Sequence, residues 1–201
     1  MEHPLTPPVP AARPQQPSTV THQPVKGFVF DVDGVLTDGT VLALASGEQV
    51  RAFHIHDGLA LRHALSKGYR VAIISGRQEE GVRRRLHALD LTDEDLFLGV
   101  ADKVRVLTAW AARAGLTLAE LAYMGDDLPD LAALRCCGLA TCPADAVPDI
   151  RDRCAWVSRY GGGRGAVREL IETVLKSHGN WLPLDEGEAA LTAAANVTPA
   201  G

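Results

Sequence analysis

Short apolar runs alternate with helical patterns through the middle of the chain. Continuous apolar runs with the length of buried strands occupy residues 27–31, 70–75, 96–100, 121–126 and 138–142. Runs of this kind are typical of strands covered on both faces. Apolar positions spaced by three or four residues predict helices over residues 59–68, 78–89, 104–114, 128–134 and 165–175. The alternation of strands and helices predicts an α/β fold with a parallel sheet.

One segment interrupts this alternation. Residues 40–55 hold two β-like stretches on either side of Ser46-Gly47, which predicts a β-hairpin. The hairpin follows the first strand directly and should project near the carboxyl end of that strand. Its stretches are apolar at Val41, Leu42, Leu44, Val50, Phe53 and Ile55. An exposed hairpin of this composition requires a partner surface.

The two ends of the chain differ from its middle. Residues 1–25 carry seven of the twelve prolines without apolar periodicity, which predicts a disordered proline-rich arm. The folded domain is expected over residues 26–180. Residues 181–201 are small, polar and rich in alanine, which predicts a flexible tail. Trp181 at its start lies outside the predicted core and should pack on another surface, such as another subunit.

Composition and charge narrow the class of protein. The 201 residues suffice for one domain with a sizeable core, and 46% of them are hydrophobic. A net charge of -5 argues against nucleic acid or a membrane surface as partner. The sequence shows neither a secretory signal nor the roughly 18 apolar residues that a membrane helix needs. Four cysteines without CxxC spacing predict buried free thiols, and a cytoplasmic location is expected.

Polar residues follow the predicted strands where a ligand would bind. Ligands of open α/β sheets bind beyond the carboxyl ends of the strands. The first strand ends in Asp31 and Asp33, the second in Ser75 and the fourth in Asp126, while Lys103 follows the third. Several carboxylates in one cleft repel one another unless a cation compensates, and their hard oxygens suit Mg²⁺. Lysine and serine can hold phosphoryl oxygens there, and one aspartate can attack phosphorus while another transfers protons.

Each of these residues also has an ordinary structural explanation. An aspartate before a glycine is commonly a turn residue, and Gly125-Asp126-Asp127 could cap a helix. Ser75 could lie in a loop and Lys103 on the surface. Their occurrence in order along the chain favours the catalytic interpretation.

The motifs DVDGVLTDG, SGR, a lysine and GDDLPD resemble, in that order, the four-motif pattern of the haloacid dehalogenase superfamily of phosphatases. The resemblance implies a Rossmann-like three-layer sandwich and a Mg²⁺ cofactor. It makes Asp31 the nucleophile, Asp33 the general acid/base, and Ser75 and Lys103 the phosphate-binding pair. It assigns the metal to the Asp31 carboxylate, the Asp33 carbonyl and Asp126, supported by Asp127 and Asp130.

The chain leaves little room for a cap domain, so the hairpin after the first strand is the main insertion. Within the superfamily the sequence resembles the capless 3-deoxy-D-manno-octulosonate (KDO) 8-phosphate phosphatases. The matching motifs are F-x-x-x-DG-L from Phe53, ISGR, GDDLPDL and GGGRGAVREL from Gly161. The resemblance implies hydrolysis of a phosphorylated sugar acid in lipopolysaccharide precursor biosynthesis. It also implies a homotetramer in which the hairpin contacts a neighbour and helps to form the cap.

The carboxylate end of such a substrate requires a cation. Arg77 and Arg164 are the leading candidates because both lie next to glycines, although either could be a surface residue at the start of a helix. Arg62, His54 and His56 are weaker candidates. The complete set of expected substrate-binding residues is Gly34, Gly76, Arg77, Arg164, Asp57 and Arg62.

Two alternatives stay open. The same motifs suit a phosphatase for nine-carbon sugar acid 9-phosphates of the sialic-acid type. A non-catalytic assembly domain of the same superfamily is disfavoured, because such domains can lose catalytic acids and this chain keeps Asp31, Asp33, Lys103 and Asp126.

Overall fold

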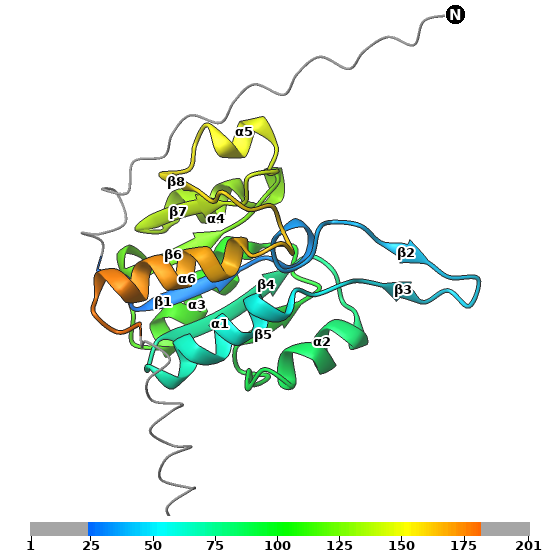
Figure 1. The fold of residues 1–201 in the computed structure, drawn as a ribbon, viewed down its shortest axis with the longest axis horizontal. Helices are drawn as coiled ribbons and strands as arrows, with labels where there is room; N and C mark the ends of the chain where they lie inside the picture. The colour runs from blue at the N-terminus through cyan, green and yellow to red at the C-terminus, as the bar shows by residue number, and fades with distance from the viewer. Residues whose placement is uncertain (1–23, 182–201) are drawn as a thin grey trace, which may run out of the picture.

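The computed structural model of the protein describes residues 24–181. The predicted arm, except for its last two residues, and the predicted tail beyond Trp181 lie outside this range. A six-stranded parallel sheet forms the centre, in the order β5-β4-β1-β6-β7-β8 (Figure 1). Its strands are β1 (Gly27–Phe30), β4 (Arg70–Ser75), β5 (Leu96–Leu98), β6 (Leu121–Met124), β7 (Leu139–Cys142) and β8 (Trp156–Val157).

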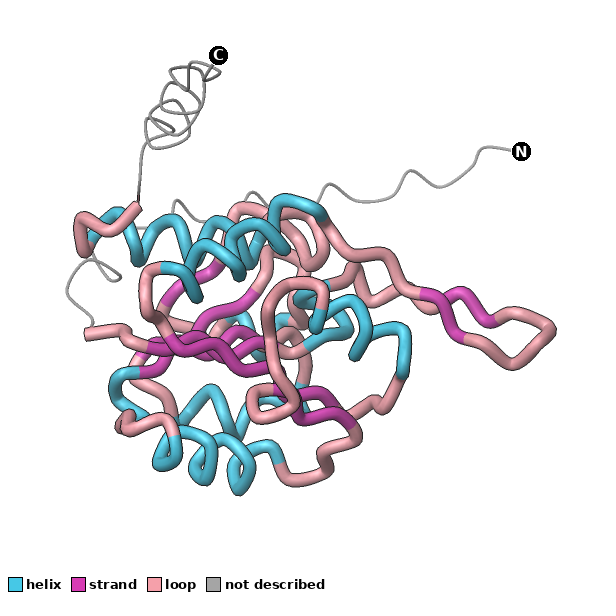
Figure 2. Tube along the Cα trace, turned by 90° about the horizontal axis from the view of Figure 1, so that it is seen from below, coloured by secondary structure: helices cyan, strands magenta, loops and turns pink. Residues whose placement is uncertain are grey.

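Helices cover both faces of the sheet, as Figure 2 shows edge-on. One face packs against α1 (Ile55–Ser66), α2 (Glu80–His87) and α6 (Ala166–Ser177). The other packs against α3 (Lys103–Arg113), α4 (Leu131–Cys136) and α5 (Pro148–Arg151). The predicted three-layer α/β sandwich is therefore confirmed, and residues 24–181 contain no cap domain.

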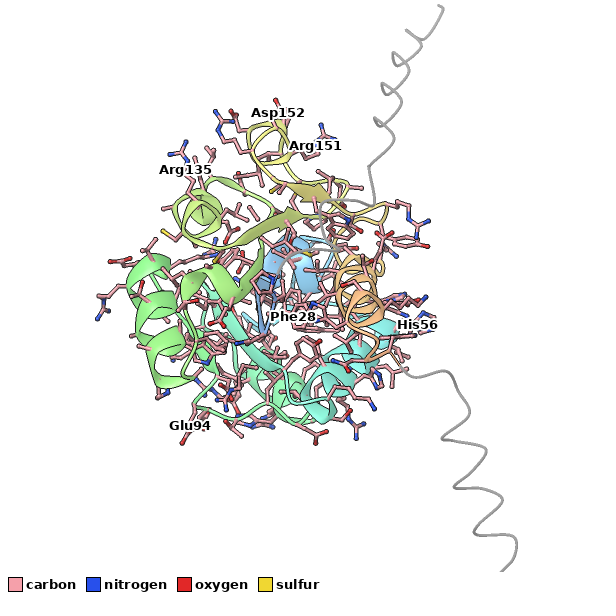
Figure 3. All side chains as sticks on the ribbon, turned by 90° about the vertical axis from the view of Figure 1, so that its left-hand side faces the viewer. Phe28, His56, Glu94, Arg135, Arg151 and Asp152 are labelled. Carbon is pink, nitrogen blue, oxygen red and sulfur yellow. The ribbon has the colours of Figure 1, made fainter. Side chains whose placement is uncertain are left out.

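The central strand β1 explains why the strands read as unbroken apolar runs. Successive side chains of a strand point to opposite faces. Phe28 and Phe30 accordingly join the core under α1 and α6, whereas Val29 joins the core under α3, and all three are fully buried. Figure 3 shows Phe28 in the interior, while Glu94 and Arg135 project from the outside. Full burial of one such side chain contributes about 1.5–3 kcal/mol.

The predicted hairpin is present but its paired part is short. Strands β2 (Leu42–Ala43) and β3 (Gln49–Val50) pair antiparallel and extend away from the body of the molecule (Figure 1). The side chains of Leu42 and Val50 are 60% and 44% exposed. Two residues assigned to the hairpin behave differently, because Phe53 packs against the core and Ile55 begins α1.

The five predicted strands and five predicted helices are all found, with shifted ends. The expected helix over 128–134 is a 3-10 turn, Leu128–Asp130, followed by α4. Strand β8 and helix α5 were not predicted, since two and four residues are too short for a clear apolar period. Among residues 24–181, none of the helices is both long and apolar enough to cross a membrane.

Three expectations about single residues need correction. Val25, assigned to the disordered arm, is buried in the core. Trp181, assigned to the flexible tail, packs on its own subunit, with its ring 4.9 Å from that of His63 and 5.2 Å from the guanidinium carbon of Arg168. The four cysteines are free as expected, but Cys136 is exposed and not buried.

Candidate active site

Polar residues from four strand ends line one cavity of about 600 Å³ at the carboxyl edge of the sheet. Asp31 directly follows β1, and Asp33 lies in the turn over 32–36 that comes next. Ser75 ends β4, Asp126 follows β6, and Lys103 begins α3. The parallel topology thus brings together residues that are up to 95 positions apart in sequence.

Asp31 combines burial with a free oxygen. It is 8% exposed, and its Oδ2 lies 3.0 Å from Nζ of Lys103. Its Oδ1 is buried and has no hydrogen-bond partner within the described part of the chain. Burial, followed by the nearby Asp130 carboxylate, raises the pKa of Asp31, while Lys103 opposes this shift. An unpaired buried carboxylate oxygen is costly unless a ligand or metal satisfies it.

Asp130 anchors the bottom of the site. Its Oδ1 accepts hydrogen bonds from Lys103 Nζ and Tyr123 Oη, each at 2.7 Å, and its Oδ2 accepts one from the Asp126 amide at 3.3 Å. Burial lowers the pKa of Lys103, but Asp31 and Asp130 outweigh this effect and raise it overall, so the lysine stays charged. The network holds the ammonium group directly beside Asp31.

Asp31, Asp126 and Asp130 form an acidic cluster in which one oxygen of each lies within 4.8 Å of the others. Burial, followed by Asp31 and Asp130, raises the pKa of Asp126 to about 7. The free Oδ1 of Asp31 and the carboxylate of Asp126 are the hard oxygen ligands that Mg²⁺ prefers. The donor set therefore fits the expected cofactor, with Asp130 mainly occupied by its hydrogen bonds.

Gly34 makes room for this cluster. A Cβ atom at this position would lie 2.0 Å from Oδ2 of Asp126, and the backbone has a φ of +82°. Only glycine meets both conditions without strain. The glycine expected to contact substrate therefore shapes the acidic cluster itself.

Asp33 is held by Arg51, which is not among the residues predicted for the site. Nε of Arg51 donates to Oδ1 of Asp33 at 2.6 Å, and Nη2 donates to Oδ2 at 3.3 Å. Arg51 follows β3 at the base of the hairpin and lines the cavity. One signal was available, because Arg51 is the only arginine or lysine in the predicted hairpin.

The remaining predicted residues in the cavity are Ser75, Gly76, Arg77 and Asp127. Ser75 is almost fully buried, and its hydroxyl accepts a hydrogen bond from the Arg77 amide at 3.3 Å. Asp127 accepts from the amide of Leu128 at 2.7 Å and so caps the following 3-10 turn. The hairpin residues Val41 and Gln49 line the same cavity.

Besides Gly34, three further expected substrate-binding residues do not line this cavity. Both oxygens of the buried Asp57 carboxylate accept backbone hydrogen bonds at the start of α6, from Gly165 and Arg168. Arg62 forms an exposed ion pair with Asp90. Arg164 pairs with Asp38 at 3.0 Å and lines a neighbouring cavity. Within one subunit these three residues therefore lie apart from the acidic cavity, and their contact with substrate stays a prediction.

Several known proteins resemble the chain over most of its length. The 3-deoxy-D-manno-octulosonate 8-phosphate phosphatase KdsC of Haemophilus influenzae is 35% identical over 167 residues, which cover 83% of this chain and 92% of that protein. The crystal structure of the phosphatase of the same name from Moraxella catarrhalis contains magnesium, phosphate and KDO. It is 34% identical, with a TM-score of 0.77, and the match covers 85% of this chain and 95% of that one.

A Legionella pneumophila protein described as a haloacid dehalogenase superfamily hydrolase of subfamily III A is 34% identical, with a TM-score of 0.75. The match covers 87% of this chain and 92% of the Legionella chain. No protein-family model matches the sequence.

Proposed function

The chain belongs to the 3-deoxy-D-manno-octulosonate 8-phosphate phosphatase family of the haloacid dehalogenase superfamily, and on that basis we propose that it hydrolyses KDO 8-phosphate to KDO and inorganic phosphate. This reaction serves lipopolysaccharide precursor biosynthesis. The observation that carries the proposal is the Asp31 carboxylate, which lies beside Lys103 with one oxygen free in a cavity lined by several aspartates.

Asp31 and Asp33 have different roles in the proposed hydrolysis. The Asp31 carboxylate attacks phosphorus, and the bond from phosphorus to the sugar O8 breaks while Asp33 gives O8 its proton. KDO leaves, and phosphorus stays bound to Asp31 as an acyl phosphate. Asp33 then takes a proton from water, the water oxygen attacks phosphorus, and the bond to Asp31 breaks. Phosphate is released, and both aspartates return to their initial states.

The neighbouring residues hold the phosphoryl group. Lys103 and Ser75 bind its oxygens, and Lys103 also keeps Asp31 ionised for attack. The carboxylates of Asp31 and Asp126, with the carbonyl of Asp33, would hold Mg²⁺, which neutralises phosphoryl charge when bound. Asp127 and Asp130 support this arrangement. Arg77, in the same cavity, is the proposed cation for the substrate carboxylate.

A substrate panel tests the activity. We expect the purified protein with Mg²⁺ to release phosphate from KDO 8-phosphate with a higher kcat/KM than from a nine-carbon sugar acid 9-phosphate. Asp31→Asn should abolish the release. A strong preference for the nine-carbon substrate would show that KDO 8-phosphate is not the main substrate. Absence of hydrolysis across the panel, with no difference between wild type and Asp31→Asn, would instead support an assembly domain.

A homotetramer is the proposed state of the protein, with the hairpin of one subunit covering a neighbour. The exposed apolar side chains of Val41, Leu42, Leu44 and Val50 support it, since a hairpin of this kind gains stability from a partner surface. Light scattering should give the mass of four chains, and Leu42→Glu should lower that mass. A wild-type monomer at working concentration would contradict the proposal. The free cysteines support a cytoplasmic location.

A further inference from the structure

We propose that Arg51 is a positioning residue for the reaction, because its guanidinium holds the Asp33 carboxylate at the edge of the cavity, where Asp33 exchanges protons with the leaving oxygen and with water. The inference rests on the proposed function, since it assigns Arg51 a task in the same two-step hydrolysis. It gives the hairpin a part in the chemistry as well as in covering the site.

The contact between the two side chains is bidentate. Nε and Nη2 of Arg51 reach one oxygen each of the Asp33 carboxylate, at 2.6 and 3.3 Å. A planar guanidinium that binds both oxygens fixes the orientation of the carboxylate as well as its position. The Arg51 side chain is 3% exposed, so this pair differs from the solvated ion pairs that contribute little.

Asp33 requires such a support because its backbone leaves its side chain at the open edge of the site. It lies in the irregular turn after β1, next to Gly34 with its positive φ, and 27% of its side chain is exposed. A general acid must come within about 2.6–3.2 Å of the atom that it protonates. A misplacement of about 1 Å can cost about 100-fold in rate.

Arg51 is itself held from the other side. Nη1 lies 3.8 Å from Oε1 of Glu79, the residue that precedes α2, and Nη2 also donates to Oε1 of Gln49 in β3 at 3.5 Å. The guanidinium thus links three parts of the molecule: the catalytic turn, the base of the hairpin and the start of α2. The hydrogen bonds to Asp33 and Gln49 orient the group, whereas Nη1 has no hydrogen-bond partner among the described residues and meets Glu79 only as a charge.

Steady-state kinetics with KDO 8-phosphate test the assignment. Arg51→Gln should lower kcat by about 10- to 100-fold and change KM by less than about twofold, because the phosphate-binding residues stay in place. Arg51→Lys should recover part of the rate, since lysine keeps the positive charge but cannot form the bidentate hydrogen bonds of a guanidinium. Arg84→Gln is the matched control, because Arg84 forms an exposed ion pair with Glu80 on α2 and should retain the wild-type rate. An Arg51→Gln variant with unchanged or increased kcat overturns the proposal.

A double-mutant cycle with Asp33→Asn separates positioning from other roles. If Arg51 acts through Asp33, adding Arg51→Gln to Asp33→Asn should change kcat by less than about twofold. A further loss equal to that seen in the wild-type background would show that Arg51 acts elsewhere. A rise in KM alone would assign it to substrate binding and would equally overturn the proposal.

A crystal structure of Arg51→Gln supplies a readout that does not depend on activity. We expect the Asp33 carboxylate to leave its wild-type position, and an unmoved carboxylate overturns the proposal. A wild-type protein that hydrolyses none of the panel would refute the proposed function, whereas the crystallographic result would still decide whether Arg51 positions Asp33.

Discussion

Nζ of Lys103 lies 3.0 Å from Oδ2 of Asp31, the carboxylate proposed to attack phosphorus. Lys103→Met removes the only cation within the described cavity that contacts this carboxylate, and leaves Asp31 and Asp130 to repel each other. We expect kcat/KM to fall by about 100-fold or more. Lys67→Met is the control, because Lys67 directly follows α1 at the opposite edge of the sheet, and it should retain the wild-type rate. Equal losses in the two variants would contradict the assignment.

Gly34→Ala should weaken metal binding. The added methyl group would overlap Oδ2 of Asp126 and force that carboxylate away from Asp31. We expect at least a tenfold rise in the Mg²⁺ concentration that gives half-maximal activity. Gly47→Ala carries a similar backbone strain, with a φ of +88°, but meets nothing within 4 Å. It should keep the wild-type Mg²⁺ dependence, and a matching rise in this control would attribute the effect to strain.

The stability of the metal-free protein should decrease as the pH rises towards neutrality. The pKa of Asp126 is about 7 when folded, well above that of an exposed aspartate, so the folded protein binds more protons than the unfolded chain from about pH 4 to pH 7. The free energy of unfolding falls with pH through this window. In EDTA we expect a higher Tm at pH 5.5 than at pH 7.5, with Mg²⁺ raising the Tm at pH 7.5.

Asp126→Asn provides the control for this pH effect, because the amide carries no charge at either pH. Its Tm in EDTA should differ less between pH 5.5 and pH 7.5 than that of the wild type, as measured by thermal unfolding. A variant with the full wild-type difference would show that Asp126 does not cause the effect.

Asp57→Ala should destabilise the protein without impairing substrate binding. The Asp57 carboxylate accepts from two amides at the start of α6, and loss of a helix cap costs about 0.5–2 kcal/mol. Denaturant unfolding should show that loss, while KM changes by less than about twofold. Arg62→Ala, away from the cavity, should leave both quantities near the wild-type values. A tenfold rise in KM for either variant would instead show that the substituted residue contributes to substrate binding.

The sequence predicts the fold well because each layer leaves its own pattern. β1 and β4 are buried on both faces and therefore read as unbroken apolar runs, and the helices read as apolar stripes. β8 has only two residues at the edge of the sheet, so it leaves no such pattern. Its place is determined by pairing with β7, which is a tertiary contact.

Some residues of the candidate site could likewise be predicted from the sequence, and others could not. Asp31, Ser75 and Asp126 could be predicted because strand ends converge in a parallel sheet. Arg51 could not be assigned to Asp33, because its reach depends on how the hairpin leaves the body of the protein. The contacts of Asp57 and Arg164 could not be predicted either, because a charged residue beside glycine has the same local pattern whether it caps a helix, pairs on the surface or binds a ligand.

The turn that carries Asp33 is enclosed by a loop from the far end of the domain. A Cβ atom at Gly162 would lie 1.9 Å from the carbonyl oxygen of Gly34, and the amide of Gly163 donates to the Val35 carbonyl. During synthesis, the ribosome makes the catalytic turn early but completes this loop only after more than 120 further residues. A nascent chain interrupted before Gly162 could therefore form much of its sheet yet lack a finished active site, so the protein should acquire activity only when nearly its whole domain has emerged.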